Sequence, residues 1–314
     1  MKKKKTTTVF KNQKEKTILY HLIYGVFWFL GCLHGLVSKI VSFMLGRFVY
    51  YCVPKYRHIV QDNLEIAFGE EKDIFERTYI AKKVFVNLIL LLFEIGWSLH
   101  LTDEKVSQYF EATGIEHIKK ALEKKKGVFF LTGHIGNWEL LAPVSHLLGT
   151  VTNVLYRPLD FAPLDLFFVK SRSRNGGNLI SNRGGLRKII GHIRKNEAGL
   201  ILLDQNAAWH EGVFVDFFGK RACTAKGLSV IARRLQTPVI PIFLIRKGNG
   251  FLMEVLPEVE QVFTDDETKD FEENTQRYNN IIEGVIRKYP DQWFWVHRRW
   301  KTLPYHSWPR KENR

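Results

Sequence analysis

GVFFLTGHIGNWELL, residues 127–141, is the stretch of sequence that decides the fold. Its first part, GVFFLT (127–132), is a short run of aromatic and β-branched residues, which is typical of a buried strand. Gly133 and Gly136 then permit a tight turn, and a helical pattern covers 138–148. A strand followed directly by a turn and a helix is characteristic of α/β folds, in which ligands bind where the strands end.

Further runs of the same kind follow along the chain. Helical patterns over 184–196 and 226–236 lie between several of them, and the turn KGNG (247–250) joins the last two as a hairpin. This alternation predicts an α/β fold with a largely parallel sheet sandwiched by helices. No G-x-G-x-x-G follows a strand and no P-loop is present, so a Rossmann dinucleotide site is not supported. The other expected strands are VTNVLY (151–156), LILL (200–203), PVIPIFLI (238–245) and FLMEVL (251–256).

The part of the chain before the sheet is expected to be helical, including 54–126. Residues 17–38, TILYHLIYGVFWFLGCLHGLVS, carry no formal charge, and about 20 apolar residues in a helix cross a bilayer core. The alternative is a buried or surface-lying helix of a soluble domain. Gly31 and Gly35 form one G-x-x-x-G, which is weak evidence of dimerisation. We therefore divide the chain into a basic cytoplasmic tail, a membrane-associated hydrophobic helical region and one α/β domain, at 1–16, 17–53 and 54–314.

The formal net charge of +15 is concentrated in three segments. Residues 1–16 carry seven Lys and one Glu, residues 157–195 carry nine basic and two acidic side chains, and residues 297–314 carry a net charge of +5. The rest of the chain is nearly neutral. Three separate patches indicate anionic surfaces met at particular places, whereas a uniformly basic protein would indicate nucleic acid. Hydrophobic residues make up 45% of the chain, which excludes disorder.

His134 and Glu139 form the sharpest candidate site. Five residues apart, they do not share a face of a continuous helix, but they can meet if His134 lies in the turn and Glu139 inside the helix. A neutral imidazole can take a proton from an attacking hydroxyl, and a carboxylate behind it fixes the tautomer. Free backbone N–H groups at the helix start are expected to stabilise an oxyanion. On spacing alone, a capping histidine and a surface glutamate explain the pair equally well.

GHIGNWE (133–139) resembles the H-x-x-x-x-[DE] motif of glycerolipid-type acyltransferases. More narrowly, the chain resembles the bacterial late acyltransferases of lipid A biosynthesis, the lauroyl and myristoyl transferases of the lysophospholipid-acyltransferase-like superfamily. The wider glycerolipid family has a second motif, E-G-T-R-S, but GVFVDFFG (212–219) occupies that part of this chain, as in the lipid A branch. The other matching segments are YRPLDFAPLD (156–165), SRSRN (171–175), LLDQN (202–206), GVFVDFFGKRACTAKGLSVIAR (212–233) and DQWFWVHRRWKTLP (291–304).

The resemblance implies a membrane-bound O-acyltransferase in which His134 is the general base and Glu139 orients it. The donor would be a fatty acyl chain on acyl carrier protein, and the acceptor a hydroxyl of a phosphorylated lipid A precursor. The chain has no G-x-S-x-G nucleophile elbow, which is consistent with direct attack by the acceptor's own alcohol. No metal and no organic cofactor are implied. The expected location is the bacterial inner membrane, with the catalytic domain on the cytoplasmic face beside anionic phospholipid.

Substrate contacts are expected from Arg157, Arg172 and Arg174, because an arginine fork binds phosphate with two hydrogen bonds. The alternative is that these arginines are solvated or form ion pairs. Asp204 follows an expected strand and is placed to orient Arg157 or an acceptor hydroxyl, or to form a structural ion pair. None of the three cysteines has a spacing typical of a metal site, so reduced structural thiols are expected.

Two rival functions remain open from the sequence. One keeps the chemistry but transfers the acyl chain to another glycolipid or to an amino-acid lipid. The other is a non-catalytic protein that binds anionic membranes. Nucleic acid is not an expected partner, because the chain shows no signature of an aromatic RNA-binding platform.

Overall fold

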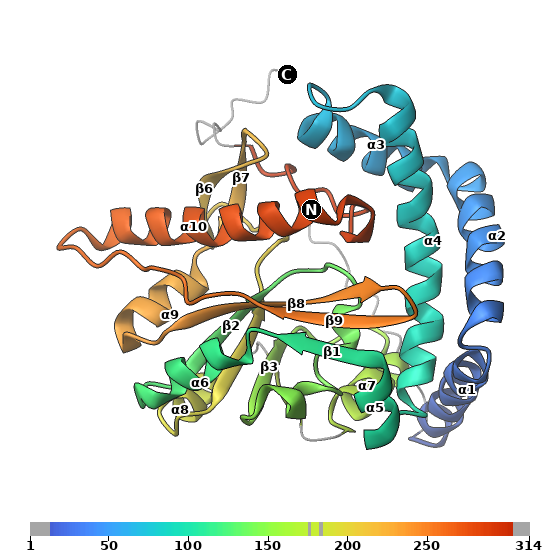
Figure 1. Cartoon of the computed structure of the whole chain (residues 1–314), viewed down its shortest axis with the longest axis horizontal. Coiled ribbons are helices and arrows are strands. Elements are labelled where there is room, and N and C mark those ends of the chain that lie inside the picture. The colour runs from blue at the N-terminus through green and yellow to red at the C-terminus, as the bar shows by residue number, and fades with distance from the viewer. Residues whose placement is uncertain (1–12, 175–176, 182–184, 304–314) are drawn as a thin grey trace.

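A mostly parallel sheet forms the centre of the computed structural model, which describes residues 13–174, 177–181 and 185–303 (Figure 1). Its strands are β1 (Phe110–Thr113), β2 (Val128–Thr132), β3 (Thr152–Tyr156), β4 (Asn178–Ser181), β5 (Ala198–Leu202), β8 (Val239–Lys247) and β9 (Gly250–Val255). Within these described ranges the strand order is β1-β9-β8-β2-β5-β3-β4. Every neighbouring pair is parallel except β8 and β9, which form an antiparallel hairpin. The predicted α/β fold with a largely parallel sheet is confirmed.

Strand β2 is covered on both faces, which explains its continuous apolar sequence. Phe129 and Leu131 belong to one buried core, and Val128 and Phe130 belong to the core on the opposite face. Figure 1 shows α10 and α6 on opposite sides of the sheet. The remaining helices of the sheet region are α5 (Asp103–Tyr109), α6 (Ile115–Glu123), α7 (Ala162–Arg172), α8 (Gly185–Ile193), α9 (Gly227–Leu235) and α10 (Glu267–Lys288).

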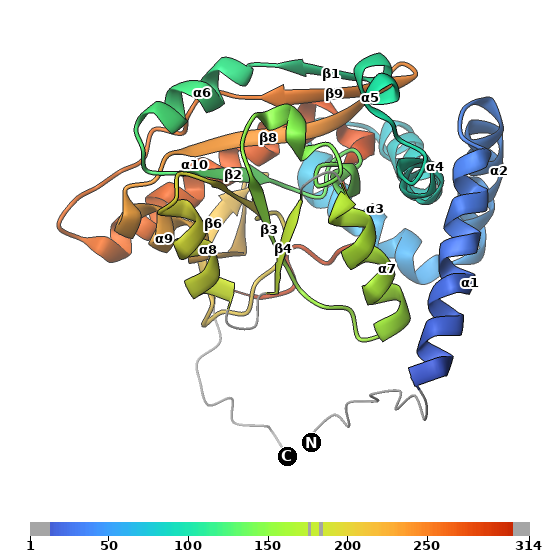
Figure 2. The ribbon, with the colours of Figure 1, turned by 90° about the horizontal axis from the view of Figure 1, so that it is seen from below.

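The N-terminal part is a layer of helices beside the sheet (Figures 1 and 2). They are α1 (Gln13–Cys32), α2 (Leu36–Cys52), α3 (Pro54–Phe68) and α4 (Ile74–Ser98). The chain bends by 113° between the apolar helices α1 and α2, and Gly35 at this break has a φ of 104°, which suits glycine. Among the described residues, no single helix has the length and hydropathy needed to cross a bilayer, although the bent pair passes that test together.

Glycines bring α1 and α2 unusually close to α4. A Cβ atom on Gly31 would lie 2.3 Å from the carbonyl oxygen of Gly96, and a Cβ on Gly46 would lie 2.5 Å from the Cα of Val86. Gly31 therefore serves a contact within the chain, and Gly35 lies outside α1, at the N-terminal cap of α2. Helix α1 also lies beside α7 (Figure 2). Between these two helices the rings of Phe27 and Phe167 stack at 4.4 Å.

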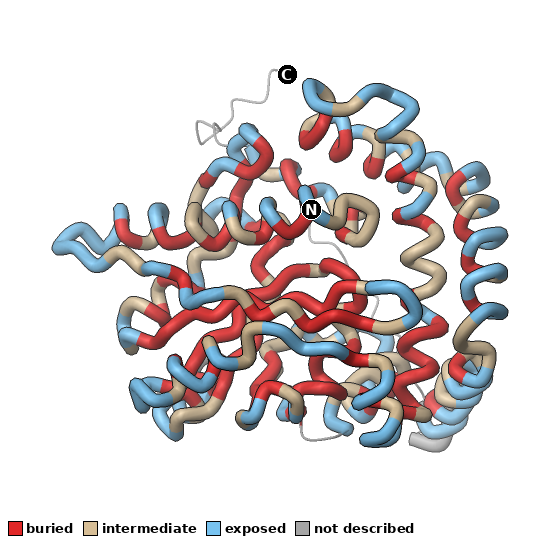
Figure 3. The backbone as a smooth tube through the Cα atoms, in the orientation of Figure 1, coloured by how far each residue is buried: buried red, intermediate tan, exposed pale blue. Residues whose placement is uncertain are grey.

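The outer faces of α1 and α2 remain exposed in spite of their apolar sequence (Figure 3). Met44 and Phe48, one helical turn apart on α2, are 64% and 63% exposed. Further exposed apolar side chains on these two helices include Leu22, Val26, Phe29, Leu36, Ile40 and Phe43. Of the basic tail expected at 1–16, residues 1–12 lie outside the described residues.

Several sequence-based expectations are wrong in detail. The helix expected over 138–148 is two short 3₁₀ segments, η1 (Trp138–Leu140) and η2 (Ser145–Leu148), because tertiary contacts hold the backbone of the preceding turn. The stretch 54–126 is not helical throughout, since it contains β1, which pairs with β9 at the sheet edge. Two elements that the sequence did not suggest form a separate antiparallel hairpin, β6 (Gly212–Phe217) and β7 (Lys220–Ala225).

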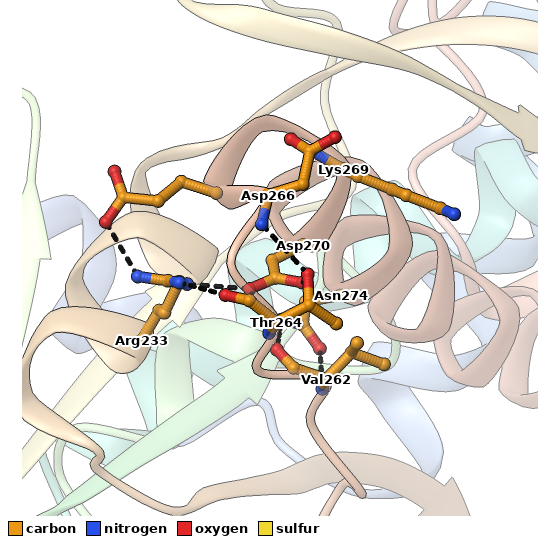
Figure 4. Close-up of polar contacts among 8 residues, drawn as sticks. Arg233, Val262, Thr264, Asp266, Lys269, Asp270 and Asn274 are labelled. Carbon is orange, nitrogen blue, oxygen red and sulfur yellow. Dashed lines mark hydrogen bonds and ion pairs between the residues drawn. The ribbon is translucent and has the colours of Figure 1, made fainter.

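A polar network fastens α10 to α9 (Figure 4). Arg233 of α9 donates through Nε to the buried carboxylate of Asp270 at 2.8 Å and through Nη2 to the carbonyl of Thr264 at 2.6 Å. Asp270 also accepts from the backbone N–H and the hydroxyl of Thr264, at 2.8 and 2.7 Å. Asn274 exchanges two hydrogen bonds with the backbone of Val262. These contacts pin the segment before α10, which precedes the C-terminal residues of the site.

Candidate active site

His134 and Asp204 meet because β2 and β5 are adjacent parallel strands in register. Thr132 pairs with Leu202 at the strand ends, so the residues two positions beyond each end lie side by side. The imidazole Nδ1 of His134 is 2.8 Å from Oδ1 of Asp204, and the backbone N–H of His134 donates to Oδ2 at 2.9 Å. The carboxylate therefore holds both the ring and the backbone of the histidine.

The surroundings of His134 define its tautomer. Because Asp204 is an acceptor, the Nδ1 of His134 carries a proton, and Nε2 carries the lone pair, toward which the side-chain amide of Gln205 donates. The side-chain Nε2 of Gln205 lies 3.3 Å from this ring nitrogen. Burial lowers the pKa of His134, but the Asp204 carboxylate, together with a smaller effect of Glu139, more than offsets this, so the pKa lies above its ordinary value of 6.5. Burial raises the pKa of Asp204, yet the His134 contacts hold it low, at about 2.

Glu139 does not contact His134 as expected. In the described part of the chain, its carboxylate accepts two hydrogen bonds from Arg172, Nε to Oε2 and Nη2 to Oε1, both at 2.8 Å. The indole N–H of Trp138 donates to Oε1 at 3.2 Å. The expected pairing of His134 with Glu139 is thus wrong, because the 3₁₀ turn directs the glutamate toward α7 while the end of β5 supplies the nearer carboxylate.

Five backbone N–H groups of the turn, where an oxyanion hole was expected, are already bonded within the protein. The backbone N–H of His134 donates to Asp204, that of Gly136 donates to the carbonyl of Gln292 at 2.9 Å, and that of Asn137 donates to the carbonyl of Leu244 at 3.1 Å. The N–H groups of Ile135 and Glu139 are likewise occupied within the turn. These amides hold the turn in place and are not directed at a substrate.

A cleft of about 610 Å³ opens beside the imidazole. Its polar lining includes His134, Gln205 and the Glu139–Arg172 ion pair. Burial lowers the pKa of Arg172, but Glu139 raises it by more, so its pKa is higher than usual and the guanidinium stays charged. The apolar lining of the cleft includes side chains of β3 and β5, namely Val154, Leu155, Leu200 and Leu202. The cleft therefore joins a base, a fixed ion pair and a surface suited to hydrocarbon.

The three predicted arginines differ in their position relative to the cleft. Arg172 and Arg157 both line the cleft, and Arg157 is exposed at its edge. Arg174 is not among the described residues that line it, and donates through Nη1 to the carbonyl of Leu99 at 2.9 Å. Among the described residues the buried carboxylate of Asp204 is bonded to His134 and Trp293, and it therefore does not orient Arg157. Gln205 was not predicted, although its place beside Asp204 at a strand end was the available signal.

No group of three or more His, Cys, Asp or Glu side chains in the described ranges is arranged to hold a metal ion. The three cysteines are free thiols, with Cys223 buried and Cys32 and Cys52 exposed.

Comparison with known proteins shows that the similarity to other proteins extends well beyond the His134 turn. The family described as bacterial lipid A biosynthesis acyltransferase matches residues 7–302. The lipid A biosynthesis palmitoleoyltransferase of Escherichia coli (strain K12) is 28% identical over 284 residues, which is 89% of this chain and 90% of the relative. The lipid A biosynthesis lauroyltransferase of the same organism is 28% identical over 291 residues, 91% of this chain and 89% of the relative.

A relative with a different name shares a shorter region. The phosphatidylinositol mannoside acyltransferase of Mycolicibacterium smegmatis is 24% identical over 202 residues, 62% of this chain and 64% of the relative. The family match, in contrast, covers nearly the whole chain, including the His134 turn, Asp204 and the C-terminal segment. The chain therefore belongs to the bacterial lipid A biosynthesis acyltransferase family and is an acyltransferase.

Proposed function

We propose that this enzyme moves a fatty acyl chain from acyl carrier protein to a hydroxyl of a phosphorylated lipid A precursor, with His134 as general base. Family membership supports acyl transfer onto lipid A. The observation that carries the mechanism is the imidazole of His134, which is held from behind by Asp204 and borders the cleft of about 610 Å³. Neither metal nor organic cofactor enters the proposal.

The proposed reaction follows from the tautomer of His134. Nε2 takes the proton of the acceptor hydroxyl while that oxygen attacks the thioester carbonyl of the donor. The C–S bond then breaks, an ester C–O bond remains, and the imidazolium returns its proton to the leaving thiolate. Asp204 stabilises the imidazolium between these two proton transfers, without taking up a proton itself.

The proposed role of Glu139 is to hold Arg172. The two parallel hydrogen bonds fix the guanidinium at the cleft, where its charge can stabilise the oxyanion or a phosphate of the acceptor. This replaces the direct contact with His134 that was expected. Arg157, exposed at the edge of the same cleft, is proposed to contact an acceptor phosphate.

We further propose that α1 and α2 attach the enzyme to the cytoplasmic face of the inner membrane. Their outer faces expose large apolar side chains, and the 113° bend is compatible with a pair that lies in the interface or re-enters it. Lys39 and Lys55, both exposed beside this surface, suit anionic phospholipid headgroups. Acyl carrier protein would then reach the cleft from the cytoplasm.

The proposal is tested by incubating purified enzyme with a panel of acyl carrier protein thioesters and a lipid A precursor. Wild-type protein is expected to form an ester product detectable by mass spectrometry, and His134→Ala to form none above background. His192→Ala is the matched control, because His192 also pairs with a carboxylate, Nδ1 to Oε2 of Glu197 at 2.7 Å, but lies outside the cleft. Full activity of folded His134→Ala protein contradicts the mechanism, whereas the absence of ester product from folded wild-type protein with every donor in the panel supports the non-catalytic membrane-binding alternative.

A second acceptor has one observation in its favour. The phosphatidylinositol mannoside acyltransferase is related over 202 residues, so another glycolipid, such as a glycosylated phospholipid, is the alternative acceptor. An amino-acid lipid remains a further alternative of the same chemistry. Mass spectrometry of total lipids from a deletion strain separates these acceptors. Loss of a secondary acyl chain from lipid A supports the first proposal, and its retention with loss of another acylated lipid overturns it.

A further inference from the structure

The C-terminal segment 291–300 lies directly against the His134 turn. The backbone N–H of Phe294 donates to the carbonyl of His134 at 3.0 Å, and Ile135 forms an antiparallel bridge with Trp293. The carbonyl of Gln292 accepts from the N–H of Gly136. This segment therefore contacts the turn along its backbone and brings its side chains to the neighbouring strand end.

Trp293 uses this position to reach Asp204. Its indole N–H donates to Oδ2 of Asp204 at 2.7 Å, and the side chain is 2% exposed. Oδ2 also accepts from the backbone N–H of His134, whereas Oδ1 faces the imidazole Nδ1. One carboxylate oxygen is thus saturated by fixed donors, and the other is directed at the ring. Trp293 is not among the described residues that line the cleft.

Two more side chains of the segment form hydrogen bonds with backbone groups of Asn206 and Cys223. His297 accepts the backbone N–H of Asn206 on Nε2 at 2.9 Å. Arg299, fully buried, donates through Nη1 to the carbonyl of Cys223 at 2.8 Å. Within the described ranges Arg299 has no ion-pair partner, so its charge acts on Asp204 over a longer distance.

We propose that Trp293 is a positioning residue for acyl transfer, which holds Oδ2 of Asp204 through its indole N–H so that only Oδ1 faces the imidazole of His134. The inference rests on the proposed function and deepens it. A carboxylate without this donor keeps more negative charge for the imidazole and binds the imidazolium more tightly. Trp293 therefore limits how strongly Asp204 stabilises the imidazolium of His134, which must later release its proton. The other charged or titratable groups near the pair are His297, Arg299, Glu139 and Arg172.

The test removes the N–H and keeps the ring. Replacing the Trp293 side chain by 3-benzothienylalanine, which has sulfur in place of the indole N–H, preserves its volume. We expect the acid limb of the kcat/KM profile to move to higher pH, with KM unchanged. If the limb moves up by one pH unit, kcat/KM on its acid side falls about tenfold, and alkaline pH restores the rate. A merely structural defect is not restored by pH.

The same replacement at Trp295 is the matched control. Trp295 packs against Trp293 at a ring distance of 4.5 Å and is equally buried, but its indole N–H donates to the carbonyl of Pro290. Its profile is expected to coincide with that of the wild type. Coincidence of the Trp293 profile with the wild type, or equal shifts at both tryptophans, overturns the proposal.

A measurement without substrate separates this inference from the proposed function. The pKa of His134 can be read by NMR in protein with isotopically labelled histidine, using His134→Ala to assign the resonance. A pKa raised by the Trp293 replacement and unchanged by the Trp295 replacement supports the positioning role even if no acceptor is acylated. An unchanged His134 pKa in both proteins overturns it even if the wild type is an active acyltransferase.

Discussion

The carboxylate of Asp204 holds His134 at two points, the imidazole Nδ1 at 2.8 Å and the backbone N–H at 2.9 Å, although the two residues are 70 positions apart. Glu139, only five positions from the histidine, instead holds Arg172. The motif GHIGNWE therefore supplies one partner to each of two polar pairs, His134 to the pair with Asp204 and Glu139 to the pair with Arg172. The partners come from the end of β5 and from α7, which the parallel sheet brings to the same cleft.

Asp204→Asn is expected to lower kcat by about 10³- to 10⁴-fold, because an amide does not stabilise the imidazolium and permits the wrong tautomer. The substitution also removes the carboxylate that contributes most to raising the His134 pKa, so the effect of burial, which lowers this pKa, is no longer offset by Asp204. In the wild type, His134 must be neutral to accept a proton, so activity is expected to rise with pH through a limb above 6.5. The residual activity of the variant is expected to rise through a limb at lower pH. A kcat/KM profile measured from pH 5 to 9 checks both expectations, and unchanged activity in Asp204→Asn contradicts the role.

Glu139→Gln and Arg172→Met are expected to be non-additive. Each single change breaks the ion pair and leaves a partly buried group in the cleft, so each is expected to lower kcat/KM by at least about tenfold. The double variant is expected to lose little more than either single variant. The measurement is a double-mutant cycle with donor and acceptor held at fixed concentrations. Additive losses would instead indicate that Glu139 acts on another group.

How far the sequence predicts the site depends on distance along the chain. The strand GVFFLT and the turn after it were predictable, because a run of buried aromatics ending in glycines is a local signal. The 3₁₀ conformation after the turn was not predictable, since the backbone N–H groups of the turn are bonded to the carbonyls of Gln292 and Leu244, which are distant in the sequence. The partner of His134 was missed for the same reason. Asp204 was recognised as a strand-end residue, but only strand order shows that β5 lies next to β2.

Glu94→Gln is expected to destabilise the fold by about 3–5 kcal/mol, because it leaves the Arg246 guanidinium without its carboxylate in a site where the two side chains are 12% and 4% exposed. Glu94 also accepts from the buried amide of Asn137 at 2.8 Å. Urea unfolding measures the free energy of unfolding. Glu111→Gln is the control, because its ion pair with Lys247 is well exposed and contributes at most about 1 kcal/mol. Similar losses in the two variants would contradict the distinction.

Gly31→Ala is expected to loosen α1 from α4 and to cost about 1–3 kcal/mol, because its Cβ would meet the backbone of Gly96 at 2.3 Å and backbone cannot move aside cheaply. Gly25→Ala, in the same helix, has no atom within 4 Å of the added Cβ. Helix propensity alone predicts that this second change is neutral or stabilising by up to about 1 kcal/mol. Thermal unfolding of both variants in the same detergent compares them. Equal midpoints would show that the close approach of α1 to α4 does not contribute to stability.

Membrane attachment through α2 predicts that Met44→Glu combined with Phe48→Glu abolishes binding to vesicles that contain phosphatidylglycerol. Both side chains are more than 60% exposed on one face, so the change removes apolar contact and adds like charge to an anionic surface without disturbing the core. Cosedimentation measures the bound fraction, and circular dichroism checks that the helices remain. Phe263→Glu is the control, since this phenylalanine is 50% exposed on the loop between β9 and α10 and lies outside the proposed surface. Its binding is expected to equal that of the wild type. Retained binding in the double variant would place the attachment elsewhere on the molecule, and equal loss in the Phe263 variant would mean that no single face is responsible.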